Sequence, residues 1–131
     1  MVICIKIFRY HSAGCAKYAR SLCKSLYVKG IIKQMYAVIF KAEINKLDKS
    51  YSDTALRMRE LAISQYGCTE FVAVTEGNHE IAISYWENQE QIVKWKQDAE
   101  HLVAQEMGCS TWYKSYKVEV VEVIREYAKN T

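Results

Sequence analysis

The chain has 131 residues, of which 50% are hydrophobic and 25% charged, with no proline and a formal net charge of +3. This balance predicts a folded globular chain and excludes a disordered one. No apolar run approaches the roughly 20 residues that cross a bilayer, and no segment has the pattern of a cleaved signal peptide, so we expect a cytoplasmic protein without membrane association.

Basic residues are distributed unevenly along the chain. Residues 1–34 contain seven Lys or Arg and no acidic residue, whereas residues 35–131 contain eleven basic and fifteen acidic side chains. Three interpretations of this leader stay open: a basic arm that binds RNA or a membrane surface, an organellar presequence, or a segment outside the folded unit that precedes an internal start at Met35. The abrupt change in composition favours the third, with one folded domain over residues 35–131.

Hydrophobic periodicity then predicts a strand, a helix and a hairpin in chain order. Residues 35–44, "MYAVIFKAEI", alternate and begin with residues that are apolar on both faces, which is typical of an interior strand. Residues 47–67 carry apolar side chains at helical spacing and end at Gly67, so they predict an amphipathic helix. Two short β-rich runs, 68–75 and 80–86, are separated by a turn-forming Gly-Asn pair and predict a hairpin.

A second helical pattern and a last strand complete the unit. Asn88 stands at an N-cap position with Gln91 three residues later as its capping-box partner, and the helical pattern runs to about Ser110. Residues 116–127, "YKVEVVEVIREY", predict the closing strand. The order β-α-β-β-α-β predicts an α+β, ferredoxin-like fold, with an antiparallel four-stranded sheet and two helices on one of its faces.

The sheet face without helices is also expected to be apolar. Residues 81–86 of the hairpin's second strand form two alternating sets, and neither is charged: Ile81, Ile83 and Tyr85 on one face, and Ala82, Ser84 and Trp86 on the other. A single chain with this face in solvent would expose more apolar surface than the few hundred Å² usual for soluble proteins. We therefore expect a homodimer in which a second copy of the chain covers the open face.

Residues 36–127 resemble the antibiotic biosynthesis monooxygenase (ABM) domain family of the dimeric α/β-barrel superfamily. The resemblance is carried by "AVIFKAEI", "ISYWENQEQIVKWKQDAEHLVAQEMG" and "WYKSYKVEVVEVIREY", and its most specific part is an aromatic-Trp strand end followed by a helix with W-x5-H-x3-Q. It implies two ferredoxin-like units paired sheet to sheet, with a small pocket between sheet and helices in each subunit. Some members of the family oxygenate hydroquinones or polyketide aromatics without a cofactor, so the resemblance implies this activity as one possibility.

That chemistry asks little of the protein, because an electron-rich phenolate can reduce O2 without a cofactor. The site must bind an aromatic ring, favour its anion and exclude water. We expect His101 to be the base or the group that orients the substrate, since an imidazole titrates near neutral pH. The residues expected to contact the substrate supply flat walls and hydrogen-bonding tips: Gln105, Trp112, Tyr113, Trp95 and Tyr116.

The direction of the His101 side chain depends on whether the second helix is continuous. On an uninterrupted helix Trp95, Leu102 and Val103 share the apolar face and His101 points to solvent. If Asp98 caps a second helix, His101 instead begins a separate stripe. Most histidines in helices are not catalytic, so a structural or supporting role is weighed above direct catalysis.

The stripe that follows such a break would consist of His101, Gln105, Gly108 and Trp112. Trp95 is expected to be a core residue with one edge towards the pocket. The buried hydroxyl of Tyr113 or Tyr116 needs a partner, for which His101 and Gln105 are the candidates.

Haem degradation is a third possibility within the same superfamily. The resemblance implies an axial His about ten residues after the helix Trp and an Asn in the first strand, but here the tenth residue after Trp95 is Gln105 and no Asn stands near Phe40. We rank it below two alternatives: a cofactor-independent monooxygenase that acts on a small electron-rich aromatic, and a non-catalytic dimer of the same fold that binds a small ligand.

Other motif searches narrow the function by what they do not find. The sequence contains no P-loop, no G-x-G-x-x-G, no G-x-S-x-G and no H-E-x-x-H motif. Its five cysteines are scattered without a C-x-x-C pair, which is typical of reduced thiols. The isolated pairs His11 with Cys15 and His79 with Glu80 do not predict a metal site. No basic stripe marks residues 35–131, so we expect no nucleic-acid partner. The resemblance implies chemistry without a cofactor, and the isolated pairs give no reason to expect a metal.

Overall fold

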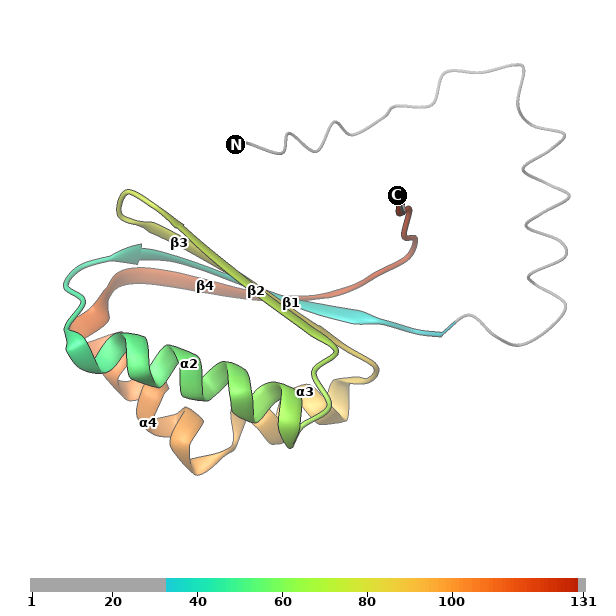
Figure 1. Ribbon diagram of the computed structural model, residues 1–131, viewed down its shortest axis with the longest axis horizontal. Coiled ribbons are helices and arrows are strands. Elements are labelled where there is room, and N and C mark those ends of the chain that lie inside the picture. Colours follow the sequence, from blue (N-terminus) through green and yellow to red (C-terminus); the bar gives the residue numbers. More distant parts are fainter. Residues whose placement is uncertain (1–32, 130–131) are drawn as a thin grey trace, which may run out of the picture. The chain divides into compact units, whose positions relative to one another are not determined.

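The computed structural model describes residues 33–129, which form one antiparallel sheet with all helices on one side (Figure 1). The strand order is β2-β3-β1-β4. This arrangement confirms the predicted ferredoxin-like α+β fold. The leader prediction for residues 1–34 lies outside the described residues, except for Lys33 and Gln34. The elements are β1 (Tyr36–Ile44), α2 (Lys49–Ser64), β2 (Glu70–Glu76), β3 (His79–Trp86), α3 (Gln89–Lys96), α4 (Ala99–Met107), the π-helix η1 (Gly108–Trp112) and β4 (Tyr113–Glu122).

Local sequence signals explain where most of these elements begin and end. The Asp48 carboxylate accepts a hydrogen bond from the Tyr51 backbone N–H at 3.1 Å and caps α2. The predicted capping box of Asn88 and Gln91 is present at the start of α3. Gly67 adopts a φ of +81° after α2, where a residue with a side chain would be strained.

The core lies between the sheet and the helices. Val38 of β1 and Trp86 of β3 pack there against Ala62 of α2 and against Ile92 and Trp95 of α3. Trp86 is fully buried, and its indole N–H donates to Ser84 Oγ at 2.8 Å. Trp95 is therefore a core residue, as its helical spacing predicts.

β4 begins and ends earlier than predicted. The sequence pattern indicated residues 116–127, whereas the strand covers Tyr113–Glu122 and Tyr113 already pairs with Ile44 of β1. The early end has a simple reason: β1, the partner strand, begins at Tyr36, and the last backbone hydrogen bond runs from Val123 N to Met35 O at 2.8 Å.

The sheet face opposite the helices is apolar and partly exposed. Residues directly opposite each other in an antiparallel pair share a face, so the pairs Ile39 with Ile83 and Val72 with Ile83 place these side chains together. Val74 is 59% exposed and Ile81 39% exposed on the same face. The predicted open apolar face is thus present, with Lys41, Lys117 and Glu119 at its β4 side.

Within residues 33–129, no helix combines the length and apolar character that a membrane span requires.

Candidate functional site

The second predicted helix is broken at Asp98. α3 ends at Lys96 and α4 begins at Ala99, and Asp98 Oδ1 accepts hydrogen bonds from the backbone N–H groups of Glu100 at 2.8 Å and His101 at 3.2 Å. An aspartate that bonds to nearby backbone N–H groups competes with a continuous helix. The interpretation as one uninterrupted helix is therefore wrong.

The break changes which side chains face the core. In a continuous helix Leu102 and Val103 would share the face of Trp95, but they are 53% and 62% exposed. His101 is partly buried instead, with its ring centroid 4.0 Å from that of Trp95. The direction of His101 thus follows from the Asp98 cap and not from the periodicity of the preceding helix.

His101 is held by the end of α3. Its Nδ1 lies 3.0 Å from the carbonyl oxygen of Trp95. Burial lowers the pKa of His101, and this effect outweighs the opposing influences of the Trp95 carbonyl and the Asp98 carboxylate. The imidazole is therefore neutral at pH 7, the state in which a histidine can accept a proton.

Gln105 makes a similar contact one turn later. Its Nε2 donates to the carbonyl oxygen of Lys96 at 2.9 Å. Side chains from α4 therefore bind two carbonyl groups in the last turn of α3, where a helix has few backbone donors left. The side-chain nitrogen of Gln105 is engaged with α3, a use that the sequence pattern did not reveal.

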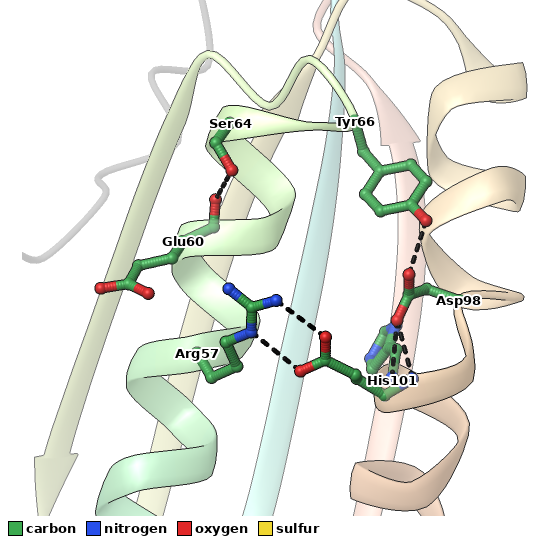
Figure 2. Close-up of polar contacts among 7 residues, drawn as sticks. Arg57, Glu60, Ser64, Tyr66, Asp98 and His101 are labelled. Carbon is green, nitrogen blue, oxygen red and sulfur yellow. Dashed lines mark hydrogen bonds and ion pairs between the residues drawn. The ribbon is translucent and has the colours of Figure 1, made fainter.

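Two contacts from α2 and its following loop fix the start of α4 (Figure 2). Arg57 donates two hydrogen bonds of 2.8 Å to the Glu100 carboxylate. The Tyr66 hydroxyl donates to Asp98 Oδ2 at 2.6 Å, which lowers the pKa of Asp98 and raises that of Tyr66. Tyr66 could not be predicted as a partner of Asp98, because it lies 32 residues before Asp98 and no local motif links the two.

A second polar group lies on the helix-facing side of the sheet, around a buried carboxylate. Glu80 is only 7% exposed, and its Oε2 accepts hydrogen bonds from the hydroxyls of Tyr51 at 2.5 Å and Tyr113 at 3.0 Å. Burial and the bond to Glu80 raise the pKa of Tyr51 to about 12, and burial also raises that of Tyr113. The prediction that His101 or Gln105 would be the partner of Tyr113 is wrong.

Aromatic rings surround this carboxylate group. Phe40 lies 5.3 Å from Tyr113 and 6.0 Å from Tyr116 between ring centroids, and Tyr51 meets Trp112 edge-on at 5.3 Å. The structure therefore brings three predicted site residues together with Phe40 and Tyr51, which the sequence analysis did not select.

The three predicted residues differ in accessibility. Trp112 is buried, and its indole N–H makes no hydrogen bond of normal geometry with the described residues, although it lies close enough to Asp48 to contribute to the lowered pKa of that carboxyl. The hydroxyl of Tyr116 lies 3.3 Å from Cys109 Sγ, and this tyrosine is 51% exposed. Of the three, Tyr116 is the one best able to meet a ligand.

The strip of sheet beside this group is left uncovered on the helix side. Phe40 lies opposite Val118, and Val38 opposite Val120, so these valines belong to the face that carries the core. Val118 is 52% exposed and Val120 51% exposed. An apolar surface is therefore available next to Phe40 and Tyr116.

The predicted site residues thus form two groups joined by α4. His101 near the start of α4 and Gln105 one turn later bind the carbonyl oxygens of Trp95 and Lys96. Gly108, which follows α4, lies so close to Tyr113 that a Cβ on it would approach the Tyr113 ring to 3.2 Å. The seven residues from His101 to Gly108 span roughly 10 Å, so His101 and the aromatic group do not form one cluster.

Two shallow surface hollows occur elsewhere. Their volumes are ≈ 310 and ≈ 360 Å³. The first is lined by α2 and the second by α3 and the following Gln97, and neither lining includes a predicted site residue. Among residues 33–129 no three His, Cys, Asp or Glu side chains are grouped as metal ligands.

A comparison of sequences identifies the family. Over 99 residues the chain is 39% identical to the uncharacterized protein YqjZ of Bacillus subtilis (strain 168). The matched region covers 73% of this chain and 87% of YqjZ. The chain belongs to the YqjZ family. No protein-family model matches it.

Solved structures show that this YqjZ-family protein has the ABM fold. It superposes on SnoaB, a cofactor-independent oxygenase from Streptomyces nogalater, with a TM-score of 0.62 and 9% identity over 72% of this chain and 98% of that chain. A Nitrosomonas europaea protein provisionally named an antibiotic biosynthesis monooxygenase gives 0.59 with 16% identity over 69% and 90%. Rv0793 from Mycobacterium tuberculosis gives 0.63 with 11% identity over 72% and 99%. The fold expected from the sequence resemblance is confirmed.

Proposed function

We propose that this YqjZ-family protein is a cytoplasmic, cofactor-independent monooxygenase that acts on a small electron-rich aromatic of the quinol or polyketide type. One observation carries the proposal most: His101 is partly buried, has a lowered pKa and is held at the start of the helix whose other end packs on the aromatic group. A fold shared with SnoaB, a cofactor-independent oxygenase, supports the reaction class.

In the proposed reaction the substrate supplies the electrons. His101 accepts a proton from the substrate, and the resulting anion reduces O2. One oxygen atom enters the ring system as a carbonyl and the other leaves as water, so that oxidation of an anthrone methylene to a quinone balances without a cofactor. The protein's part is to bind the ring, favour the anion and keep bulk water away.

Substrate binding is proposed from His101 along α4 to the uncovered strip of the sheet, over roughly 10 Å, so that the reacting carbon lies at His101 and the rest of the ring system on the strip. Phe40 and Tyr116 present flat surfaces there, and Val118 extends them along β4. Tyr113 packs against Phe40 and is held by its hydrogen bond to Glu80, while Trp112 packs against Tyr51. Trp95 supports His101 in the same way, because the two rings stack.

The second proposal is a non-catalytic dimer that binds a small apolar ligand. It is favoured by the use of both His101 and Gln105 to satisfy carbonyl groups of α3, which is a structural task. Homodimerisation through the open sheet face is part of both proposals, because Val74 and Ile81 would otherwise leave a continuous apolar surface in water.

Oxygen uptake with a panel of hydroquinones and anthrones separates the two. The enzyme proposal expects uptake by the wild type and a fall of about 100-fold or more in His101→Ala, the usual range for loss of a general base. His79→Ala is the matched control, because His79 is an exposed histidine at the start of β3. Uptake that survives in His101→Ala removes the histidine from the mechanism, and no uptake with any substrate favours the ligand-binding protein.

A further inference from the structure

The contact between His101 and Trp95 determines which ring nitrogen carries the proton. A backbone carbonyl can only accept a hydrogen bond, so the nitrogen 3.0 Å from the Trp95 oxygen, Nδ1, must be the donor. Because the lowered pKa keeps the ring neutral at pH 7, Nε2 then has no proton and holds the lone pair. A histidine in this tautomer can act as a base only through Nε2.

The Trp95 carbonyl is available because the helix is broken. In a continuous helix it would accept the backbone N–H of Ala99, four residues later. Here Ala99 is the first residue of α4, and the Trp95 oxygen instead accepts the N–H of Asp98 at 3.1 Å and the His101 side chain. The tautomer of His101 therefore depends on the interruption between α3 and α4.

Both carboxylate oxygens of Asp98 maintain the interruption. Oδ1 accepts the backbone N–H groups of Glu100 and His101, and Oδ2 accepts the hydroxyl of Tyr66 (Figure 2). The tyrosine follows α2, so this bond ties the junction to a different part of the chain. Arg57 reinforces it through its two hydrogen bonds to Glu100.

We propose that Asp98 and Tyr66 are positioning residues that hold His101 as the Nδ1–H tautomer, with Nε2 as the proton acceptor. The consequence for catalysis rests on the function proposed above, whereas the tautomer does not. The charged groups near the ring are Lys96, the last residue of α3, and Asp98, the N-cap of α4, while Glu100 on α4 is paired with Arg57 of α2.

The ring nitrogens of the full-length, 15N-labelled protein report the tautomer directly by NMR across a pH titration. The signals of His101 are those that disappear in His101→Gln. In the wild type we expect a pyrrole-like Nδ1 and a pyridine-like Nε2, with a titration midpoint below the ordinary value of 6.5. A protonated Nε2, or a mixture of tautomers, in the wild type would overturn the proposal.

Substitutions then test the two positioning residues. Asp98→Ala removes the cap, so we expect a tautomer mixture, and its midpoint should lie above that of Asp98→Asn, which loses the same charge but keeps the ring in place. Asp98→Asn keeps a good N-cap and should rescue the wild-type tautomer. Tyr66→Phe removes one hydroxyl bond to Asp98, so it tests the proposal even if Asp98→Ala does not fold, and it should populate the second tautomer of His101. Tyr127→Phe is the matched control, because Tyr127 is 83% exposed.

Unchanged His101 spectra in both Asp98→Ala and Tyr66→Phe would show that neither residue positions the ring. Oxygen uptake provides the second measurement. Asp98→Ala should lower kcat about as far as His101→Gln does, with KM little changed. If the wild type oxidises no substrate, the proposed function is wrong, but the NMR spectra still decide whether Asp98 and Tyr66 hold the tautomer of His101.

Discussion

At the scale of single residues, His101 links the candidate chemistry to the stability of the fold. Its folded-state pKa is lowered, so on acidification the unfolded chain binds a proton before the folded chain does. The stabilisation from the neutral ring is therefore fully present above pH 6.5 and is lost as the pH falls from 6.5 through the lower folded-state value. Asp98 and Glu100, whose pKa values are also lowered, lose their contributions only at pH values below about 4.5.

We accordingly expect the free energy of unfolding of the wild type to fall between pH 7.5 and pH 5.5. In His101→Gln the fall should be smaller, because the variant has no proton to take up at this position. Urea unfolding at the two pH values measures the difference. An equal fall in both proteins would mean that His101 is not protected from protonation in the folded chain.

Glu80 provides a second prediction at this scale. Glu80→Ala leaves the hydroxyls of Tyr51 and Tyr113 without their acceptor in a partly buried position, so it should lower the free energy of unfolding by about 2 kcal/mol or more. Glu80→Gln keeps an acceptor oxygen and should cost less. Glu76→Ala, at an exposed position of β2, is the control for loss of a glutamate. Equal stability of Glu80→Ala and Glu76→Ala would contradict the role of the buried carboxylate.

The sequence predicted those residue contacts that are local. The Asn88–Gln91 capping box follows from residues three apart, and the Asp98 cap was one of two interpretations that residues near it allowed. The partners of Glu80 could not be predicted in the same way, because Tyr51 and Tyr113 lie 29 and 33 residues away. A signal was nevertheless present: Glu80 is a charged residue on the strand face that otherwise carries Ala82, Ser84 and Trp86.

At the scale of elements, the connection from α2 to β2 depends on Gly67. Its φ of +81° already disfavours a side chain, and a Cβ would also collide with the side-chain nitrogen of Gln91. That collision would disturb the hydrogen bonds that the Gln91 carboxamide oxygen accepts from the backbone N–H groups of Glu87 and Asn88. Gly67 therefore affects the start of α3 as well as the end of α2.

Gly77 offers a matched comparison. It also has a positive φ, of 60°, but a Cβ there would meet nothing within 4 Å. Gly67→Ala and Gly77→Ala should share a backbone cost of about 1–2 kcal/mol, and Gly67→Ala should lose more because of the collision. Thermal unfolding of the two variants gives the comparison, and equal melting temperatures would show that Gln91 moves aside without cost.

The elements themselves were mostly predictable, and the exceptions have physical causes. An amphipathic pattern is compatible with both a continuous and a broken helix, so only the Asp98 contacts distinguish them. The π-helix over Gly108–Trp112 has no local signature in the sequence. β4 follows it directly and begins at Tyr113, three residues earlier than predicted. The end of β4 is determined by the length of β1, which is a long-range effect.

At the scale of the whole molecule, the order of elements was sufficient to predict the ferredoxin-like fold, because β-α-β-β-α-β leaves few ways to build one sheet. The position of a ligand was not predictable, because it depends on which part of the sheet the helices leave uncovered. That strip lies along β4, beside Phe40 and Tyr116.

The open face leads to a prediction about assembly. We expect the wild type to sediment as a dimer and Ile83→Lys, which places a charge in the centre of the open face, to sediment as a monomer near 15 kDa. Leu56→Lys is the control, because Leu56 is 59% exposed on a helix on the other side of the sheet. A monomeric wild type would contradict the covered face.

The proposed base can be tested most directly by comparing two titrations of the same group. The pH dependence of kcat/KM is measured with a hydroquinone or anthrone that the protein oxidises, and the NMR titration of His101 is recorded in the same buffer. Our account predicts that the rate falls with decreasing pH at the His101 midpoint, below 6.5, because the protonated ring cannot accept a proton. A rate that stays constant through that midpoint, or that keeps the same pH dependence in His101→Gln, would contradict it.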